Sequence, residues 1–257
     1  MRCTNMHLVV AVFAAAAMSL SVDGFGQVKE TTKEEKKKKP TAPAQWNFFA
    51  HYKQRVEQIE RSIAELPADT TATIVLLGDS ITEGFPVTEI AGMRVVNMGI
   101  SGDQIAMDRP DGGVRNRVHL LAKARPAHVF LLIGINDFGS SKPLDKAKSQ
   151  YEDLVRAIRT AVPNAKLHIQ SVLPTRGRFA HHNPTVSAMN DFLRNLSKRE
   201  NADFIDLAAL MRDERGELRK GWTGDGLHLL PPAYEEWKKV LEEKVRANES
   251  TRATEGK

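Results

Sequence analysis

The chain has 257 residues, of which 27% are charged and 41% hydrophobic, and its formal net charge is +5. Residues 27–44 hold six Lys and three Glu, while residues 1–26 are neutral, so residues 45–257 carry only +2. Because the positive charge is concentrated in one short segment, we expect no nucleic-acid binding by the rest of the chain. The only cysteine, Cys3, lies near the amino terminus. Disulfides and thiolate metal sites are therefore excluded beyond it.

The two ends of the chain differ in character from its middle. Residues 1–26 contain Arg2, an apolar run over residues 8–20 and then small residues, a layout that predicts a signal peptide and a secreted or periplasmic protein. An uncleaved anchor is the alternative, although the apolar run is short for a membrane span. The apolar-poor residues 27–44 predict a disordered Lys-rich linker, and residues 248–257 a flexible tail. We therefore place the folded domain at residues 45–247.

Within this domain, apolar runs alternate with amphipathic segments. The runs predict strands at residues 73–77, 94–99, 127–133, 166–173 and 203–207. The segments predict helices at residues 45–66, 113–124, 144–162, 185–200 and 231–245. Strands that alternate with helices indicate an α/β fold with a parallel, doubly wound sheet.

Three consecutive strands are followed by polar turns that contain glycine. These turns are Gly78-Asp79-Ser80, residues 99–103 and Gly134-Ile135-Asn136-Asp137. In a parallel sheet the turns lie at one edge, where open α/β folds bind ligands. Ser80 has two interpretations at this stage, because a serine after a buried strand is also a common helix N-cap.

A pair of residues near the carboxyl terminus supplies the remaining parts of an acyl-transfer site. Asp225 stands three residues before His228, close enough to fix the tautomer of the imidazole. We expect Ser80 to be the nucleophile and His228 its general base. The Ser80 and Gly102 backbone N–H groups and the Asn136 amide are the expected oxyanion-hole donors.

The same residues resemble the signature blocks of the SGNH hydrolases, also called the GDSL-type lipase/esterase family. The four blocks occur in order over about residues 72–243. They are Gly78-Asp79-Ser80-Ile81, with Ile81 where the family name has Leu, then Asn97 to Asp103, Gly134 to Asp137, and Asp225-Gly226-Leu227-His228. The resemblance implies a flavodoxin-like three-layer α/β/α sandwich with a five-stranded parallel sheet. It also implies a metal-independent ester hydrolase that needs no cofactor.

Within the family, the second block and Leu173-Pro174-Thr175-Arg176 are most similar to the acetylhydrolase branch. That branch includes platelet-activating-factor acetylhydrolase subunits and carbohydrate deacetylases. The resemblance therefore implies removal of acetyl or short acyl groups from a carbohydrate or small ester. The short apolar run of the expected signal peptide predicts no stable membrane insertion after signal cleavage. A lysophospholipase or lipase, an acyltransferase, and a carbohydrate-binding envelope module without activity are the alternatives.

Several other polar residues have weaker functional interpretations. His181 and His182 lack a third ligand at a suitable spacing, so we predict no metal site there. Arg176 and Arg178 are candidates to face an anionic substrate, but loop arginines are usually solvated. The sequence does not determine the oligomeric state.

Overall fold

Five parallel strands and one short antiparallel strand form the central sheet of the computed structural model. The parallel strands are β1 (Thr73–Gly78), β3 (Met93–Gly99), β4 (Pro126–Leu132), β5 (Lys166–Gln170) and β6 (Asp203–Ile205). The spatial order is β2-β3-β1-β4-β5-β6, and β2 (Glu89–Ile90) pairs antiparallel with β3. The structure describes residues 46–68, 70 and 72–255. The expected signal peptide and linker lie outside this part of the chain.

The central strand β1 lies between β3 and β4, and all of its residues are buried. This arrangement confirms that the unbroken apolar run Ile74 to Leu77 belongs to a strand covered on both faces. The predicted α/β fold with five parallel strands is confirmed as well. Strand β2 was not predicted, because a two-residue strand leaves no periodic pattern in the sequence.

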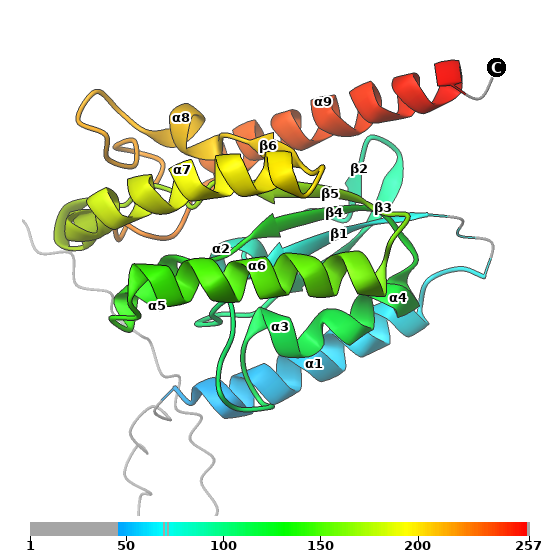
Figure 1. The fold of residues 1–257 in the computed structure, drawn as a ribbon, viewed down its shortest axis with the longest axis horizontal. Coiled ribbons are helices and arrows are strands. Elements are labelled where there is room, and N and C mark those ends of the chain that lie inside the picture. Colours follow the sequence, from blue (N-terminus) through cyan, green and yellow to red (C-terminus); the bar gives the residue numbers. More distant parts are fainter. Residues whose placement is uncertain (1–45, 69, 71, 256–257) are drawn as a thin grey trace, which may run out of the picture. The chain divides into compact units, whose positions relative to one another are not determined.

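Helices cover both faces of the sheet. The long helices are α1 (Phe48–Ala64), α6 (Leu144–Ala161), α7 (Asn183–Arg199) and α9 (Pro231–Glu255). Helix α6 contacts α3 and α7, and Figure 1 shows α9 on the opposite side of the strands from α3 and α6. The short helices are α2 (Ser80–Glu83), α3 (Val114–Arg117), α4 (Leu121–Ala124), α5 (Ile135–Gly139) and α8 (Leu207–Met211). None of the helices in the described part of the chain is both long and apolar enough to cross a membrane.

Aromatic packing fixes α9 against the sheet and against α2. The Trp237 ring is fully buried and stacks on Phe85 with a centroid distance of 4.5 Å. Its indole N–H donates to Gln170 Oε1 on β5 at 2.6 Å. The Tyr234 hydroxyl donates to the Ile81 carbonyl of α2 at 2.9 Å. The amino-terminal half of α9 therefore supports the segment that carries Ser80.

Element boundaries differ from the predicted ones in a few places. The first helix begins at Phe48 rather than at residue 45, because Asn47 is its N-cap and accepts from the Phe49 and Ala50 N–H groups. The predicted helix 113–124 is divided into α3, the 3₁₀ segment η1 (Val118–Leu120) and α4. The predicted loop at residues 175–183 contains a second 3₁₀ segment, η2 (Gly177–His182).

The last helix extends ten residues beyond the predicted end at residue 245, so residues 248–255, assigned to the tail, are helical. Polar contacts at the starts of the strands account for this extension. Asn248 donates to Asp203 Oδ2 at 3.3 Å, and Glu249 Oε1 lies 3.4 Å from His128 Nε2. His128 Nδ1 lies 3.0 Å from His168 Nε2, and both imidazoles are buried. The extra turns of α9 thus close a polar cluster that their polar sequence alone does not indicate.

Candidate active site

The three polar turns begin at the same level of the sheet. Gly78, the last residue of β1, pairs with Gly99 of β3 and with Leu132 of β4. The turns that follow these strands carry Ser80, Gly102 and Asn136, respectively. In Figure 1, α2 and α5 are both found at the end of the sheet toward which the strand arrows point. The register of the sheet thus gathers the three predicted residues at one edge.

Ser80 is the first residue of α2, and its neighbour Asp79 is the N-cap. Asp79 Oδ1 accepts a hydrogen bond from the Ile81 N–H at 3.0 Å. Asp79, and not Ser80, is therefore the N-cap of α2. The Ser80 hydroxyl is left available for another partner. Helix α2 also packs directly on Gly99, where a Cβ atom would lie only 2.1 Å from the Glu83 nitrogen. A glycine is therefore required at the end of β3.

A chain of two hydrogen bonds joins Ser80, His228 and Asp225. Ser80 Oγ lies 3.0 Å from His228 Nε2, and His228 Nδ1 lies 2.7 Å from Asp225 Oδ2. The other carboxylate oxygen, Asp225 Oδ1, accepts from the backbone N–H groups of Leu227 and His228 at 2.9 and 2.8 Å. Burial would raise the pKa of Asp225, but the hydrogen bonds from His228 and the backbone outweigh it and hold the pKa below its usual range. The carboxylate is thus ionised at neutral pH and orients the imidazole.

The loop that carries Asp225 and His228 is held by the segment after β5. The Arg176 N–H donates to the Gly226 carbonyl at 2.8 Å. Gly226 has φ +91°, and a Cβ atom there would lie 2.2 Å from the Arg176 carbonyl oxygen. The Arg176 guanidinium pairs with Asp213 and lies 3.3 Å from Glu217, so it braces this region instead of facing open solvent.

The predicted oxyanion-hole residues lie in the turns after β3 and β4. Asn136 Nδ2 donates to the Asp103 carbonyl at 2.9 Å, which connects the two turns directly. Gly102 adopts φ +79°, a backbone conformation that favours glycine. The Asp103 side chain is fully buried and accepts from the Gly113 N–H at 2.6 Å and from the Arg117 guanidinium.

The family follows from a comparison of the chain with models of known protein families. The model of the GDSL-like lipase/acylhydrolase family matches residues 76–236. The chain belongs to this family. The match spans all five predicted site residues, from Ser80 to His228, and it confirms the resemblance drawn from the four sequence blocks. The family is one of lipases and acylhydrolases.

Known structures share this fold at low sequence identity. A GDSL-like lipase from Bacteroides thetaiotaomicron has a TM-score of 0.63 and 20% identity, with 78% of this chain and 99% of that chain covered. The carbohydrate acetylesterase Est24 from Sinorhizobium meliloti has a TM-score of 0.57 and 16% identity, with 68% of this chain and 99% of that chain covered.

A curated protein with sequence similarity to this chain is considerably longer than this chain. It is an N-acylneuraminate cytidylyltransferase of Escherichia coli O18:K1:H7, 27% identical over 174 residues. The aligned part covers 65% of this chain but only 38% of the relative. This chain thus matches well under half of that protein.

Two buried or half-buried basic residues, Arg117 and Lys142, support the candidate active site but were not predicted from the sequence. Arg117, which is 1% exposed, donates to the Gly78 and Met98 carbonyls at 2.6 and 3.0 Å and pairs with Asp103. Lys142 donates to Asp137 Oδ1 at 2.5 Å, and Asp137 Oδ2 accepts from the Ile105 N–H. No local pattern identifies such residues, because Arg117 and Lys142 lie outside the signature blocks and their partners are fixed by the packing of the turns.

The second glycine-bearing block, Asn97 to Asp103, also positions a carboxylate on α2. Glu83 Oε2 accepts from the Ser101 N–H at 2.5 Å and lies 3.1 Å from His51 Nε2. Burial would raise the pKa of Glu83, but the hydrogen bonds from His51 and Ser101 lower it below its usual value. Glu83 therefore ties the loop before Gly102 to the helix that begins with Ser80.

The remaining polar candidates lie outside the hydrogen-bonded chain of Ser80, His228 and Asp225. His181 and His182 lie side by side on η2 with ring centroids 3.9 Å apart, and Arg178 stacks on the Phe179 ring. Among the residues described, no group of three or more His, Cys, Asp or Glu side chains is arranged to hold a metal ion.

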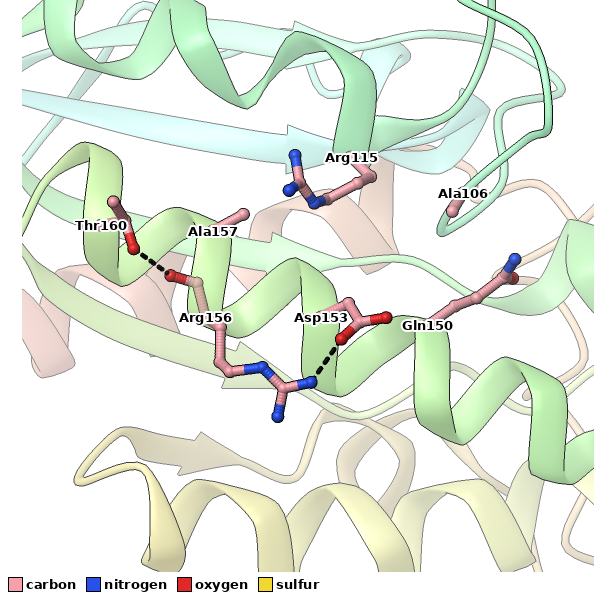
Figure 2. A pocket seen from close by; sticks show the side chains of 7 residues that line it. All are labelled: Ala106, Arg115, Gln150, Asp153, Arg156, Ala157 and Thr160. Atoms are coloured by element: carbon pink, nitrogen blue, oxygen red, sulfur yellow. Dashed lines mark hydrogen bonds and ion pairs between the residues drawn. The ribbon is translucent and has the colours of Figure 1, made fainter.

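A separate hollow of about 400 Å³ lies between α3 and α6. Figure 2 shows Arg115 on one side and the polar face of α6 on the other, with Asp153 paired to Arg156. None of the predicted site residues lines it. The hollow therefore does not contribute to the candidate active site.

Proposed function

We propose that this acylhydrolase is a serine esterase that removes acetyl or other short acyl groups from a carbohydrate or small ester. The observation that carries the proposal is the hydrogen-bonded chain from Asp225 through His228 to Ser80. Its distances suit a nucleophile, a base and a residue that orients the base.

The proposed reaction begins with attack of Ser80 Oγ on the ester carbonyl carbon. The hydroxyl proton passes to His228 Nε2, and Asp225 stabilises the resulting imidazolium. The Ser80 and Gly102 backbone N–H groups and the Asn136 amide donate to the oxyanion that forms. The Asn136 amide has two N–H bonds, so it can donate to the oxyanion while retaining its bond to Asp103.

Collapse of this intermediate breaks the bond to the alcohol, which takes the proton from His228. The acyl group is then attached to Ser80. A water molecule attacks the acyl-enzyme, His228 accepts a proton from that water, and return of the proton to Ser80 Oγ releases the carboxylic acid.

The scarcity of exposed apolar surface supports a short acyl group. Among the described residues, the exposed large hydrophobic side chains are Trp46 and Leu230. A lipase needs a long apolar groove for a fatty-acid chain. Two exposed apolar side chains are too few to line such a groove. The fold shared with a carbohydrate acetylesterase and the name of the N-acylneuraminate relative favour a sugar ester over a lipid.

Substitution of the proposed nucleophile tests the reaction. We expect Ser80→Ala to abolish hydrolysis of p-nitrophenyl acetate while the circular dichroism spectrum is unchanged. The control Ser62→Ala removes an exposed hydroxyl on α1 that bonds only to its own helix. Labelling by a fluorophosphonate, in which Ser80 Oγ displaces fluoride, should be lost in the Ser80 variant alone. Retained hydrolysis or labelling would refute the proposed role.

We further propose export, based on the signal-like composition of residues 1–26. Expression of the full chain in a bacterial host, followed by cell fractionation and amino-terminal sequencing, tests this proposal. We expect an exported protein that begins after about residue 26. An intact amino terminus in the cytoplasmic fraction would contradict it.

A further inference from the structure

The amino-terminal end of α1 places an exposed indole at the edge of the candidate active site. Trp46 is 61% exposed, although tryptophan is usually well buried. A single exposed apolar side chain needs no functional explanation by itself. The position of Trp46 is what distinguishes it, because it directly precedes α1, and Figure 1 shows the start of α1 at the same end of the domain as α2 and α5.

The indole lies directly against the turn that contains Gly102. A Cβ atom at Gly102 would lie 3.0 Å from Trp46 Cη2 and 3.1 Å from Phe48 Cδ2. Gly102 is a proposed donor to the oxyanion, so Trp46 borders the place where the ester carbonyl would bind. A substrate group that extends from this carbonyl toward α1 would meet the exposed indole.

Neighbouring side chains hold the indole in place. The Phe48 ring packs edge to face with it at a centroid distance of 6.1 Å, and the His51 ring lies at 6.3 Å. His51 Nε2 lies 3.1 Å from Glu83 Oε2, which also accepts from the Ser101 N–H. These contacts connect the indole to α2 and to the Gly102 turn. The aromatic surface is therefore preorganised beside the reacting groups.

We propose that Trp46 is a specificity-determining residue that stacks on one face of the sugar ring of an acylated carbohydrate. The inference rests on the proposed esterase function and names the substrate class of that site. A pyranose presents a face of C–H groups and a rim of hydroxyls, which suits an aromatic plane beside hydrogen-bonding side chains. His51 supplies such a polar group next to Trp46, and its imidazole pairs in turn with Glu83. A fatty-acid chain would instead require further exposed apolar residues.

Kinetics of two acetate esters test the stacking. Acetylated xylobiose offers a sugar ring, while ethyl acetate offers the same acyl group without one, and a pH-stat follows both reactions. The measured quantity is the ratio of kcat/KM for the sugar ester to kcat/KM for ethyl acetate. We expect Trp46→Ala to lower this ratio roughly tenfold, equivalent to about 1.4 kcal/mol. Most of the change should be an increase in KM for the sugar ester.

The variant Trp46→Tyr serves as the matched control, because it retains an aromatic face, and we expect it to keep most of the ratio. An unchanged ratio in Trp46→Ala, or equal losses on both esters, would overturn the inference, since the indole would then only support the loop. Turnover of ethyl acetate without turnover of acetylated xylobiose by the unsubstituted protein would overturn it too. Failure of the proposed function itself looks different, because activity on both esters would then be absent or would survive Ser80→Ala.

Discussion

Asn136 Nδ2 donates a hydrogen bond to the main-chain carbonyl of Asp103 at 2.9 Å, and so joins the turn after β4 to the turn after β3. This bond orients the Asn136 amide beside the loop that contains Gly102. The orientation matters for catalysis because an oxyanion-hole donor must be in place before charge develops on the substrate. The bond therefore links the architecture of the sheet edge to the proposed chemistry.

Removal of the Asn136 amide should slow the reaction more than it weakens substrate binding. We expect Asn136→Ala to lower kcat by about 10²- to 10³-fold with p-nitrophenyl acetate, the usual effect of losing one oxyanion donor. The control Asn116→Ala removes an amide that bonds to the Arg109 and Gly112 carbonyls in another loop. An effect on KM alone, with kcat retained, would contradict the role of Asn136.

Substitution of Asp225 tests the orientation of His228. An amide at this position cannot stabilise the imidazolium and favours the wrong tautomer, so we expect Asp225→Asn to lower kcat by about 10³- to 10⁴-fold, as in other triads. Steady-state kinetics on a short acetate ester provide the measurement. Asp153→Asn on α6, at the hollow of Figure 2, is the control carboxylate. Equal activity of the two variants would exclude Asp225 from the reaction.

Substitutions at Arg117 and Asp103, which form a buried ion pair, should have coupled effects on the free energy of unfolding. We expect Arg117→Met to lower the free energy of unfolding by about 3–5 kcal/mol, because it leaves the Asp103 carboxylate buried without its counter-ion. The double variant Arg117→Met/Asp103→Asn should recover part of the loss, since no charge then remains unpaired. Urea unfolding measures both. Additive losses in the double variant would contradict this coupling.

The close approach at Gly226 predicts a steric effect separable from backbone strain. Gly226 and Gly221 have similar φ angles, +91° and +87°, but a Cβ atom meets the Arg176 carbonyl only at Gly226. We expect Gly221→Ala to cost about 1–2 kcal/mol of stability. Gly226→Ala should cost more and should also lower kcat, because the loop that carries His228 must move. Thermal unfolding and steady-state kinetics of the two variants provide the measurement. Equal losses of stability and equal kcat values in Gly221→Ala and Gly226→Ala would refute the steric effect.

Burial raises the pKa of Asp79 to about 7, which predicts a pH-dependent difference between wild type and Asp79→Asn. Between about pH 4 and 7 the folded protein holds a proton at Asp79 that the unfolded chain releases. The free energy of unfolding contributed by this group therefore falls as pH rises through that range. Asn retains an oxygen for the Ile81 N–H but does not titrate.

The stability of Asp79→Asn relative to wild type should accordingly increase by at least about 1 kcal/mol from pH 4 to pH 8. Urea unfolding of both proteins across this range provides the measurement. A difference that does not vary with pH would show that Asp79 is already ionised at pH 4 in the folded protein.

Local patterns were sufficient for the class of fold and for the candidate residues. The apolar run Ile74 to Leu77 predicts a fully buried strand, and burial of every residue in β1 confirms it. The blocks around Ser80, Gly102, Asn136 and His228 indicated the family that the match over residues 76–236 confirms. These inferences succeed because short stretches of sequence determine whether a strand is buried and which residues form its turns. The catalytic roles of the residues stay predictions.

Contacts between segments that are distant in the sequence decided how the residues of the candidate site are arranged and supported. The sequence by itself determined a parallel α/β sheet with polar turns at one edge and a serine followed by a late Asp/His pair. Only the tertiary structure placed His228 against Ser80, made Asp79 the cap of α2, buried Arg117 beneath the turns and set Trp46 beside Gly102. The physical reason is that the partners of these groups are backbone carbonyls and rings from other elements. Such partners are defined by sheet register and helix packing, which no local pattern encodes.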